Sequence, residues 1–233
     1  SAIGVYSVAS KIPTILNSLS SIFSSAWKIS SADDFGSEDS KRFFAKIFAV
    51  YSTFLMVGSS LLIAMTKLLA KILFAKDFYV AWKITPILLI ANVVSAQAIF
   101  VGSIFTASKK TKTLFYSSMS GAIVNTLCNF CLIPQFGGTG AAIATVCGYF
   151  TILIVNIVLT RRIIKIDFVF DKNIISYLVL FFQSVVLINV DCIYGGVIVA
   201  ILFVVVSILW KNEIISLMKV VINKFTKCGA VEI

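Results

Sequence analysis

Seven apolar stretches dominate this sequence, and each is close to the roughly 20 residues that a helix needs to cross about 30 Å of hydrocarbon. They cover residues 3–26, 43–66, 84–107, 114–133, 139–160, 174–190 and 193–210. Charged residues make up only 13% of the 233 residues, whereas a soluble domain carries about 25%. The sequence therefore predicts an all-α polytopic membrane helix bundle with about seven transmembrane helices.

Basic residues are unevenly distributed between these stretches. If the first stretch runs from the outer to the inner side, most of the 20 Lys and Arg fall on the inner side. This inner set comprises Lys28, Lys41, Arg42, Lys46, Lys109, Lys110, Lys112, Arg161, Arg162, Lys165, Lys172, Lys211, Lys219, Lys224 and Lys227. Because cytoplasmic loops are enriched in Lys and Arg, the pattern predicts an N-terminus outside and a C-terminus in the cytoplasm.

The composition also argues against several function classes. The net charge of +10 comes from short basic clusters between apolar stretches, so we expect no nucleic-acid partner. The chain has no His, the commonest general base and metal ligand, so we expect no enzyme activity, no metal and no cofactor. Cys128 and Cys131 form a CxxC pair, but it lies in an apolar stretch without a second pair. Residues 137–140 (GGTG) lack the lysine of a phosphate loop and predict a turn on the outer side.

Lys11 is the only ionisable residue well inside a predicted span. A cation at that depth costs about 2.5–3.5 kcal/mol, so it is expected to face a wet cavity or a partner. Pro13 removes a backbone donor and is expected to kink this helix, opening a carbonyl toward the same cavity. The first stretch is also the richest in Ser and Thr, as in a helix that lines a cavity. The alternative is that Lys11 extends to the outer surface, as long basic side chains do.

Amide side chains are the other polar groups within the spans. Asn125 and Asn129 are one helical turn apart and share a face. Candidate substrate-binding residues are Lys11, Asn17, Asn92, Gln97, Asn125 and Asn129. Interhelical hydrogen bonding is the competing interpretation of each amide. The small residues Gly140, Ala144 and Gly148 predict close helix packing.

The outer connection, residues 67–83, holds four lysines among aromatic residues: Lys67, Lys71, Lys76 and Lys83. It is expected to be the end of a long helix followed by an interfacial segment with lysines at the membrane surface. A direct grip on an anionic headgroup or glycan phosphate is the alternative.

Several runs together resemble the C-terminal half of a bacterial polysaccharide flippase. They are residues 4–13 (GVYSVASKIP), 26–30 (AWKIS) with the acidic loop after it, 74–86 (FAKDFYVAWKITP) and 133–145 (IPQFGGTGAAIAT). Their order and spacing are similar to those of the Wzx-type O-antigen and capsule transporters. These belong to the multidrug/oligosaccharidyl-lipid/polysaccharide exporter superfamily.

The resemblance implies one lobe of a fold like that of the multidrug and toxin extrusion proteins. Residues 1–160 would be core helices of the C-terminal lobe, 161–173 a cytoplasmic connection, 174–210 a peripheral transmembrane hairpin and 211–233 a cytoplasmic tail. The sequence opens at Ser1 without Met, so we expect an N-terminal part to be missing.

The resemblance also implies an activity and partners. Such a transporter moves an undecaprenyl-diphosphate-linked oligosaccharide across the bacterial inner membrane by alternating access. Family members carry Lys or Arg where Lys11 stands, which would hold the diphosphate, and the amides would contact the glycan. Partners would be the lipid-linked oligosaccharide, membrane lipid, a polysaccharide polymerase and a chain-length regulator.

Three other functions remain open at this point. A cation-coupled drug or metabolite exporter of the same superfamily needs an intramembrane carboxylate. None lies within the seven stretches, so this alternative predicts a carboxylate in the missing N-terminal part. A membrane-embedded polysaccharide polymerase or acyltransferase needs a large catalytic loop or an intramembrane acid or His, which these stretches and their connections do not supply. A non-functional remnant is the third alternative.

Overall fold

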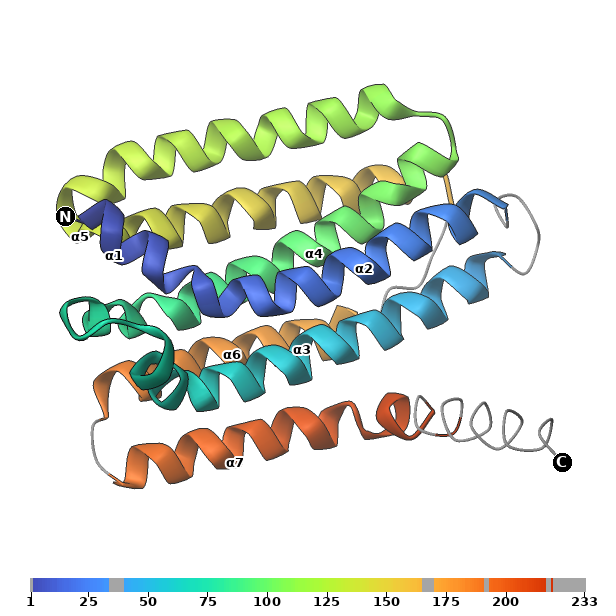
Figure 1. Ribbon diagram of the computed structural model, residues 1–233. Helices are drawn as coiled ribbons and strands as arrows, with labels where there is room; N and C mark the ends of the chain where they lie inside the picture. Colours follow the sequence, from blue (N-terminus) through green and yellow to red (C-terminus); the bar gives the residue numbers. More distant parts are fainter. Residues whose placement is uncertain (1, 34–39, 165–169, 191–192, 217–218, 220–233) are drawn as a thin grey trace, which may run out of the picture.

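The computed structural model describes residues 2–33, 40–164, 170–190, 193–216 and 219 (Figure 1). Within these residues the chain is helical and contains no strand. Its elements are α1 (Ala2–Ala9), α2 (Lys11–Asp33), α3 (Ser40–Leu73), the 3-10 helix η1 (Lys76–Lys83), α4 (Thr85–Ala107), α5 (Thr111–Thr160), α6 (Phe170–Asn189) and α7 (Ile193–Leu209). Lys165, Lys224, Lys227, the acidic loop 34–39 and most of the segment 211–233 lie outside the described residues.

Within the described residues, four helices are long and apolar enough to cross a membrane: α3, α4, α5 and α6. The helix α7 is apolar but shorter. All seven apolar stretches lie in helices, with 3–26 divided between α1 and α2 and the two stretches 114–133 and 139–160 both in α5. The chain thus has the character of a helical membrane protein, as the sequence predicts.

The helix α4 lies at the centre of the bundle. It packs against α2, α3, α5 and α6, and it is the most enclosed of the four long apolar helices. In Figure 1 the two lengths of α5 lie on one side of α4, while α3, α6 and α7 lie on the other. A sequence that is apolar on most sides suits this position, because a helix that is surrounded by others has no solvent-facing polar face.

The chain bends between α1 and α2, next to Pro13. Proline has no N–H, so the Ala9 carbonyl loses its partner within the helix. The Thr85 hydroxyl of α4 lies 3.3 Å from that carbonyl oxygen and can donate to it, and the Asn92 amide donates to the Pro13 carbonyl at 2.7 Å. The sequence-based expectation that the kink opens a carbonyl toward a cavity is therefore wrong, because the Ala9 carbonyl faces the buried Thr85 of α4.

The helix α5 folds back on itself near its middle. Gly137 has φ 55° and ψ −129°, a conformation outside the helical region, and Pro134 lies just before it. The arms before and after this point, 111–136 and 138–160, pack against each other, with Ser117 donating to the Ile152 carbonyl at 3.4 Å. A Cβ on Gly121 would lie 2.8 Å from the Gly148 carbonyl oxygen. The predicted turn at 137–140 and the predicted packing role of Gly148 are both confirmed, and the outer location of the turn stays a prediction.

The helix α3 continues beyond the predicted span 43–66 to Leu73, and η1 follows it. Trp82 of η1 is buried. The Lys67 ammonium lies 4.7 Å from the centre of its ring, and the Lys83 ammonium lies 5.9 Å from it. The predicted long helix with a separate following segment is thus present, and its place at a membrane surface stays a prediction.

Polar side chains join the helices in the bundle interior. The amide of Gln183 on α6 accepts from the Ser60 hydroxyl at 2.9 Å and donates to the Val199 carbonyl of α7 at 3.2 Å. At the far end of α7, the Trp210 indole donates to the Ser176 hydroxyl at 2.8 Å. The pair α6 and α7 therefore packs against α3 through specific hydrogen bonds as well as through apolar contact.

Candidate functional site

One side of α2 carries a polar stripe that faces away from the bundle. The stripe consists of Lys11, Thr14, Ser18, Ser21 and Ser25, spaced alternately three and four residues apart. This spacing places them on one face of a helix, and all five are exposed. The opposite face of α2 is buried, with Ile12, Leu16 and Trp27 packed in the core.

Each hydroxyl of the stripe is held by the helix itself. Thr14 donates to the Ser10 carbonyl at 2.8 Å, Ser18 to Thr14 at 3.0 Å and Ser25 to Ser21 at 2.9 Å. Such back-bonding uses the hydroxyl hydrogen but leaves lone pairs on the oxygen. The stripe therefore presents a row of hydrogen-bond acceptors, with the Lys11 cation at its beginning.

A polar groove adjoins the start of the stripe, where α1 and α2 meet α4 and α5. It consists of two neighbouring hollows of about 190 Å³ and about 420 Å³, and both are lined by Thr145 and Tyr149. The smaller hollow also has Thr14 and Asn17 in its wall. At the larger hollow, the Tyr6 hydroxyl of α1 lies 3.5 Å from that of Thr145.

Three of the predicted site residues line this groove. Asn17 and Asn92 line the smaller hollow, and Asn125 lines the larger one. The Asn92 amide nitrogen donates one hydrogen to the Pro13 carbonyl, so its oxygen and its second N–H are the groups that it can offer to a ligand. Lys11 is exposed and follows Ser10, which lines the smaller hollow.

Two other predicted residues lie elsewhere. Gln97 is buried; its nitrogen donates to Ser52 at 3.0 Å and to Asn173 at 2.8 Å, while its oxygen accepts from Tyr177 at 2.8 Å. It joins α3, α4 and α6 and does not line the groove. Asn129 donates to the Asn125 oxygen at 3.0 Å and lines a separate hollow near Pro134.

Four groove residues were not predicted from the sequence: Tyr6, Ser118, Thr145 and Tyr149. Thr145 and Tyr149 are one turn apart, and Gly148 beside them was already identified as a packing residue. The close approach that Gly148 permits is what brings the first arm of α5 to the second, with Asn125 near Thr145. The signal in the sequence was the position of the polar residues Thr145 and Tyr149 beside Gly148, which allows two helices to approach closely.

The groove is lined by hydroxyl and amide groups together with apolar residues, and no carboxylate lines it. Among the described residues, no group of three or more His, Cys, Asp or Glu side chains could hold a metal ion. Hydroxyl and amide groups suit an uncharged ligand rich in hydrogen-bonding groups, whereas the neighbouring Lys11 suits an anion.

Comparisons with known proteins give no further assignment. No family model, no curated protein and no solved structure matches this chain.

Proposed function

We propose that this chain is part of a membrane transporter that moves a lipid-linked oligosaccharide, carried on undecaprenyl diphosphate, across the bacterial inner membrane. The observation that carries the proposal is the exposed polar stripe of α2 with Lys11 at its beginning, beside the polar groove. An exposed row of polar groups on a membrane helix is typical of a wall that borders water.

The charge of Lys11 supports a role toward the diphosphate. It is exposed, so it is accessible to a ligand, and an ammonium group binds phosphate oxygens as a point charge. The stripe and the groove support contacts to a glycan, because their hydroxyl and amide groups match the hydroxyls of sugars. Asn17, Asn92 and Asn125 are the contacts that we favour, since all three line the groove.

The finer architecture is part of the same proposal. The seven helical stretches would be seven spans, and together they would form one lobe of a two-lobed transporter similar to the multidrug and toxin extrusion proteins. The stripe of α2 would then face the other lobe across a central path. The polymerase and the chain-length regulator of the polysaccharide pathway are the protein partners that we propose.

Substituting Lys11 tests the function directly. In cells that depend on this gene for surface polysaccharide, Lys11→Ala should abolish the polysaccharide, because the anionic group loses its attraction in the translocation path. Lys11→Arg should retain most of it, since the charge is kept. Polysaccharide is measured on gels of cell extracts, and the amount of protein in the membrane by immunoblot.

The control is Lys112→Ala, which removes an exposed lysine of α5 and should leave the polysaccharide unchanged. If Lys11→Ala cells make normal polysaccharide with normal protein levels, Lys11 does not hold the substrate. If Lys11→Arg is as inactive as Lys11→Ala, a role based on charge alone is wrong.

A further inference from the structure

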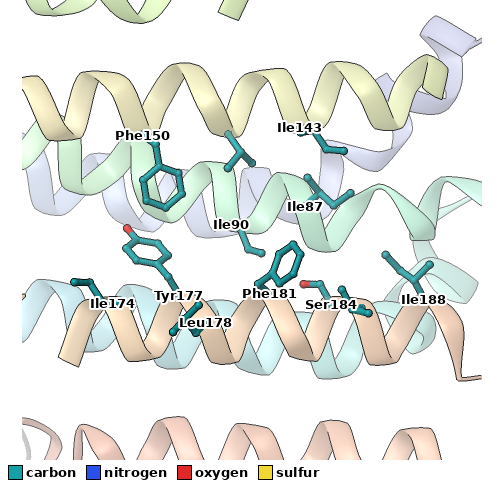
Figure 2. A pocket seen from close by; sticks show the side chains of 12 residues that line it. Ile87, Ile90, Ile143, Phe150, Ile174, Tyr177, Leu178, Phe181, Ser184 and Ile188 are labelled. Carbon is teal, nitrogen blue, oxygen red and sulfur yellow. The ribbon is translucent and has the colours of Figure 1, made fainter. Parts of the chain in front are cut away.

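A second, apolar crevice lies between α6 and the second arm of α5, with α4 as its floor (Figure 2). Ile87 and Ile90 come from α4, Ile143 and Phe150 from α5, and Tyr177 and Phe181 from α6, and the crevice encloses about 460 Å³. Figure 2 shows Phe150 and Tyr177 facing each other across it. Their ring centres are 5.1 Å apart and the rings meet edge to face.

The crevice continues beyond this pair of rings. Its second part, of about 330 Å³, is lined by Ile157 and Val158 of α5 and by Ile174 of α6. From Ile143 to Val158 the α5 wall rises by about 22 Å, at about 1.5 Å per residue. That length exceeds the thickness of about 15 Å that one leaflet contributes to the hydrocarbon core, so a lipid chain can lie along the crevice.

The surface beside the crevice is also apolar and exposed. Leu178 and Phe181 of α6 are both 64% exposed, and Ile154 of α5 is 56% exposed. In a membrane protein, lipid covers such a surface. The crevice lies between the exposed apolar residues of α5 and those of α6 and is therefore open to acyl chains. A chain that enters it gains close packing against side chains on three helices, which a flat helix surface does not offer.

Basic side chains lie at one end of this crevice. Arg161 and Arg162 are both exposed. Arg161 lies one helical turn after Ile157 and Arg162 one turn after Val158, and both of these apolar residues line the crevice. Lys172 at the start of α6 is paired with Glu213 at 2.6 Å, and so adds no net charge. Among the described residues at this end, Asp171 is an exposed carboxylate, and the two arginines outnumber it.

We propose that this crevice binds an anionic phospholipid. One acyl chain lies between α5 and α6, and the phosphate lies at Arg161 and Arg162. The arginines select the headgroup, since each basic residue near the membrane surface favours an anionic lipid. Two of them correspond to a preference of roughly 30-fold over a neutral lipid. The acyl chain fixes the position of the lipid, and this role is independent of what the protein transports.

Native mass spectrometry of the full chain in detergent tests this site. The protein is mixed with equal amounts of phosphatidylglycerol, which is anionic, and phosphatidylcholine, which is zwitterionic. The wild-type protein should retain one phosphatidylglycerol in strong preference to phosphatidylcholine. The double variant Arg161→Gln with Arg162→Gln should bring the ratio of retained phosphatidylglycerol to retained phosphatidylcholine close to one. The matched control, Lys110→Gln with Lys112→Gln, removes two exposed cations elsewhere on the chain and should keep the preference.

A second pair of variants tests the acyl chain. Ile143→Trp fills the crevice and should reduce retention of both lipids, whereas Ile123→Trp, on the exposed first arm of α5, should not. Ser184→Phe fills the crevice from the α6 side and should act like Ile143→Trp. Equal retention of the two lipids by the wild-type protein would overturn the proposal. So would an unchanged preference without the arginines, or undiminished retention when the crevice is filled.

Discussion

Lys109 has a backbone conformation that is unusual for its residue type. Its φ is 57°, and the N–H groups of Lys109 and Lys110 donate to the carbonyls of Thr106 and Phe105 at 3.1 Å and 2.8 Å. This pair of bonds ends α4 in a Schellman motif, whose left-handed residue is usually Gly. A residue with a Cβ is strained there by about 1–2 kcal/mol.

Lys109→Gly should therefore stabilise the protein. Relief of the strain outweighs the extra entropy that Gly gives to the unfolded chain, about 0.4–1 kcal/mol, so we expect a net gain of about 0.5–1 kcal/mol. A higher midpoint of thermal unfolding in detergent would show it. Lys110→Gly is the matched control, because φ at Lys110 is −98° and no strain is relieved. An equal gain from both variants would contradict the explanation.

The predicted site residues show what spacing alone can establish. Asn125 and Asn129 were placed correctly on one helix face, and they bond to each other. The sequence did not indicate that Gln97 faces Ser52, Asn173 and Tyr177. The partners of Gln97 depend on which helices become neighbours of α4. A mostly apolar helix such as α4 has no polar face that would indicate which of its sides meets which neighbour. Asn17 and Asn92 line the same hollow because α2 packs on α4, and these helices come from distant parts of the sequence.

At the scale of helices, the sequence predicted the helical stretches well and some of their ends less well. Apolar length alone located the helices α3, α4, α6 and α7. The first stretch was predicted to end at residue 26, whereas α2 continues to Asp33. The continuation of α3 beyond the span 43–66 was predicted, and its Lys67 lies over the Trp82 ring. The turn in α5 was predicted from the glycines at 137–140, which permit the positive φ of Gly137.

The fold-back of α5 makes a chemical prediction. The Cys147 thiol on the second arm lies next to Cys128 on the first, and both thiols are free. Treatment with copper phenanthroline should therefore join Cys128 to Cys147, because the oxidant removes two electrons and both thiol protons. Mass spectrometry of the digested protein would identify the linked peptides. Cys131 is exposed and should not link to Cys147, and predominance of that link would show that the arms pair differently.

At the scale of the whole molecule, several segments that carry basic residues lie at the same end of the bundle. The α4–α5 turn, the end of α5 and the start of α6 all lie at the end opposite η1 (Figure 1). These segments carry Lys110, Arg161 and Lys172. The arrangement supports the orientation predicted from charge, with η1 outside, and the orientation itself stays a prediction.

Accessibility of single cysteines tests that orientation. In a full chain whose native cysteines are replaced by Ser, Lys76→Cys in η1 should react with a membrane-impermeant maleimide on intact spheroplasts. Lys110→Cys should react only after the membrane is permeabilised, because it lies at the opposite end. Both positions are exposed, so neither result depends on burial. The reverse pattern of labelling would show that the chain is inserted the other way.

The enclosed position of α4 has a consequence for how the protein is made. Its partners precede it and follow it in the chain, since Trp27 of α2 donates to Ser103 and Asn173 of α6 accepts from Gln97. During synthesis, α4 can pair with α2 and α3 as soon as it is inserted, and Gln97 can then donate to Ser52 of α3. The second N–H of Gln97 and its oxygen gain their partners, Asn173 and Tyr177, only when α6 emerges. A ribosome that stalls between α4 and α6 therefore leaves the Gln97 amide with only part of its hydrogen bonds made, which membrane quality control can recognise.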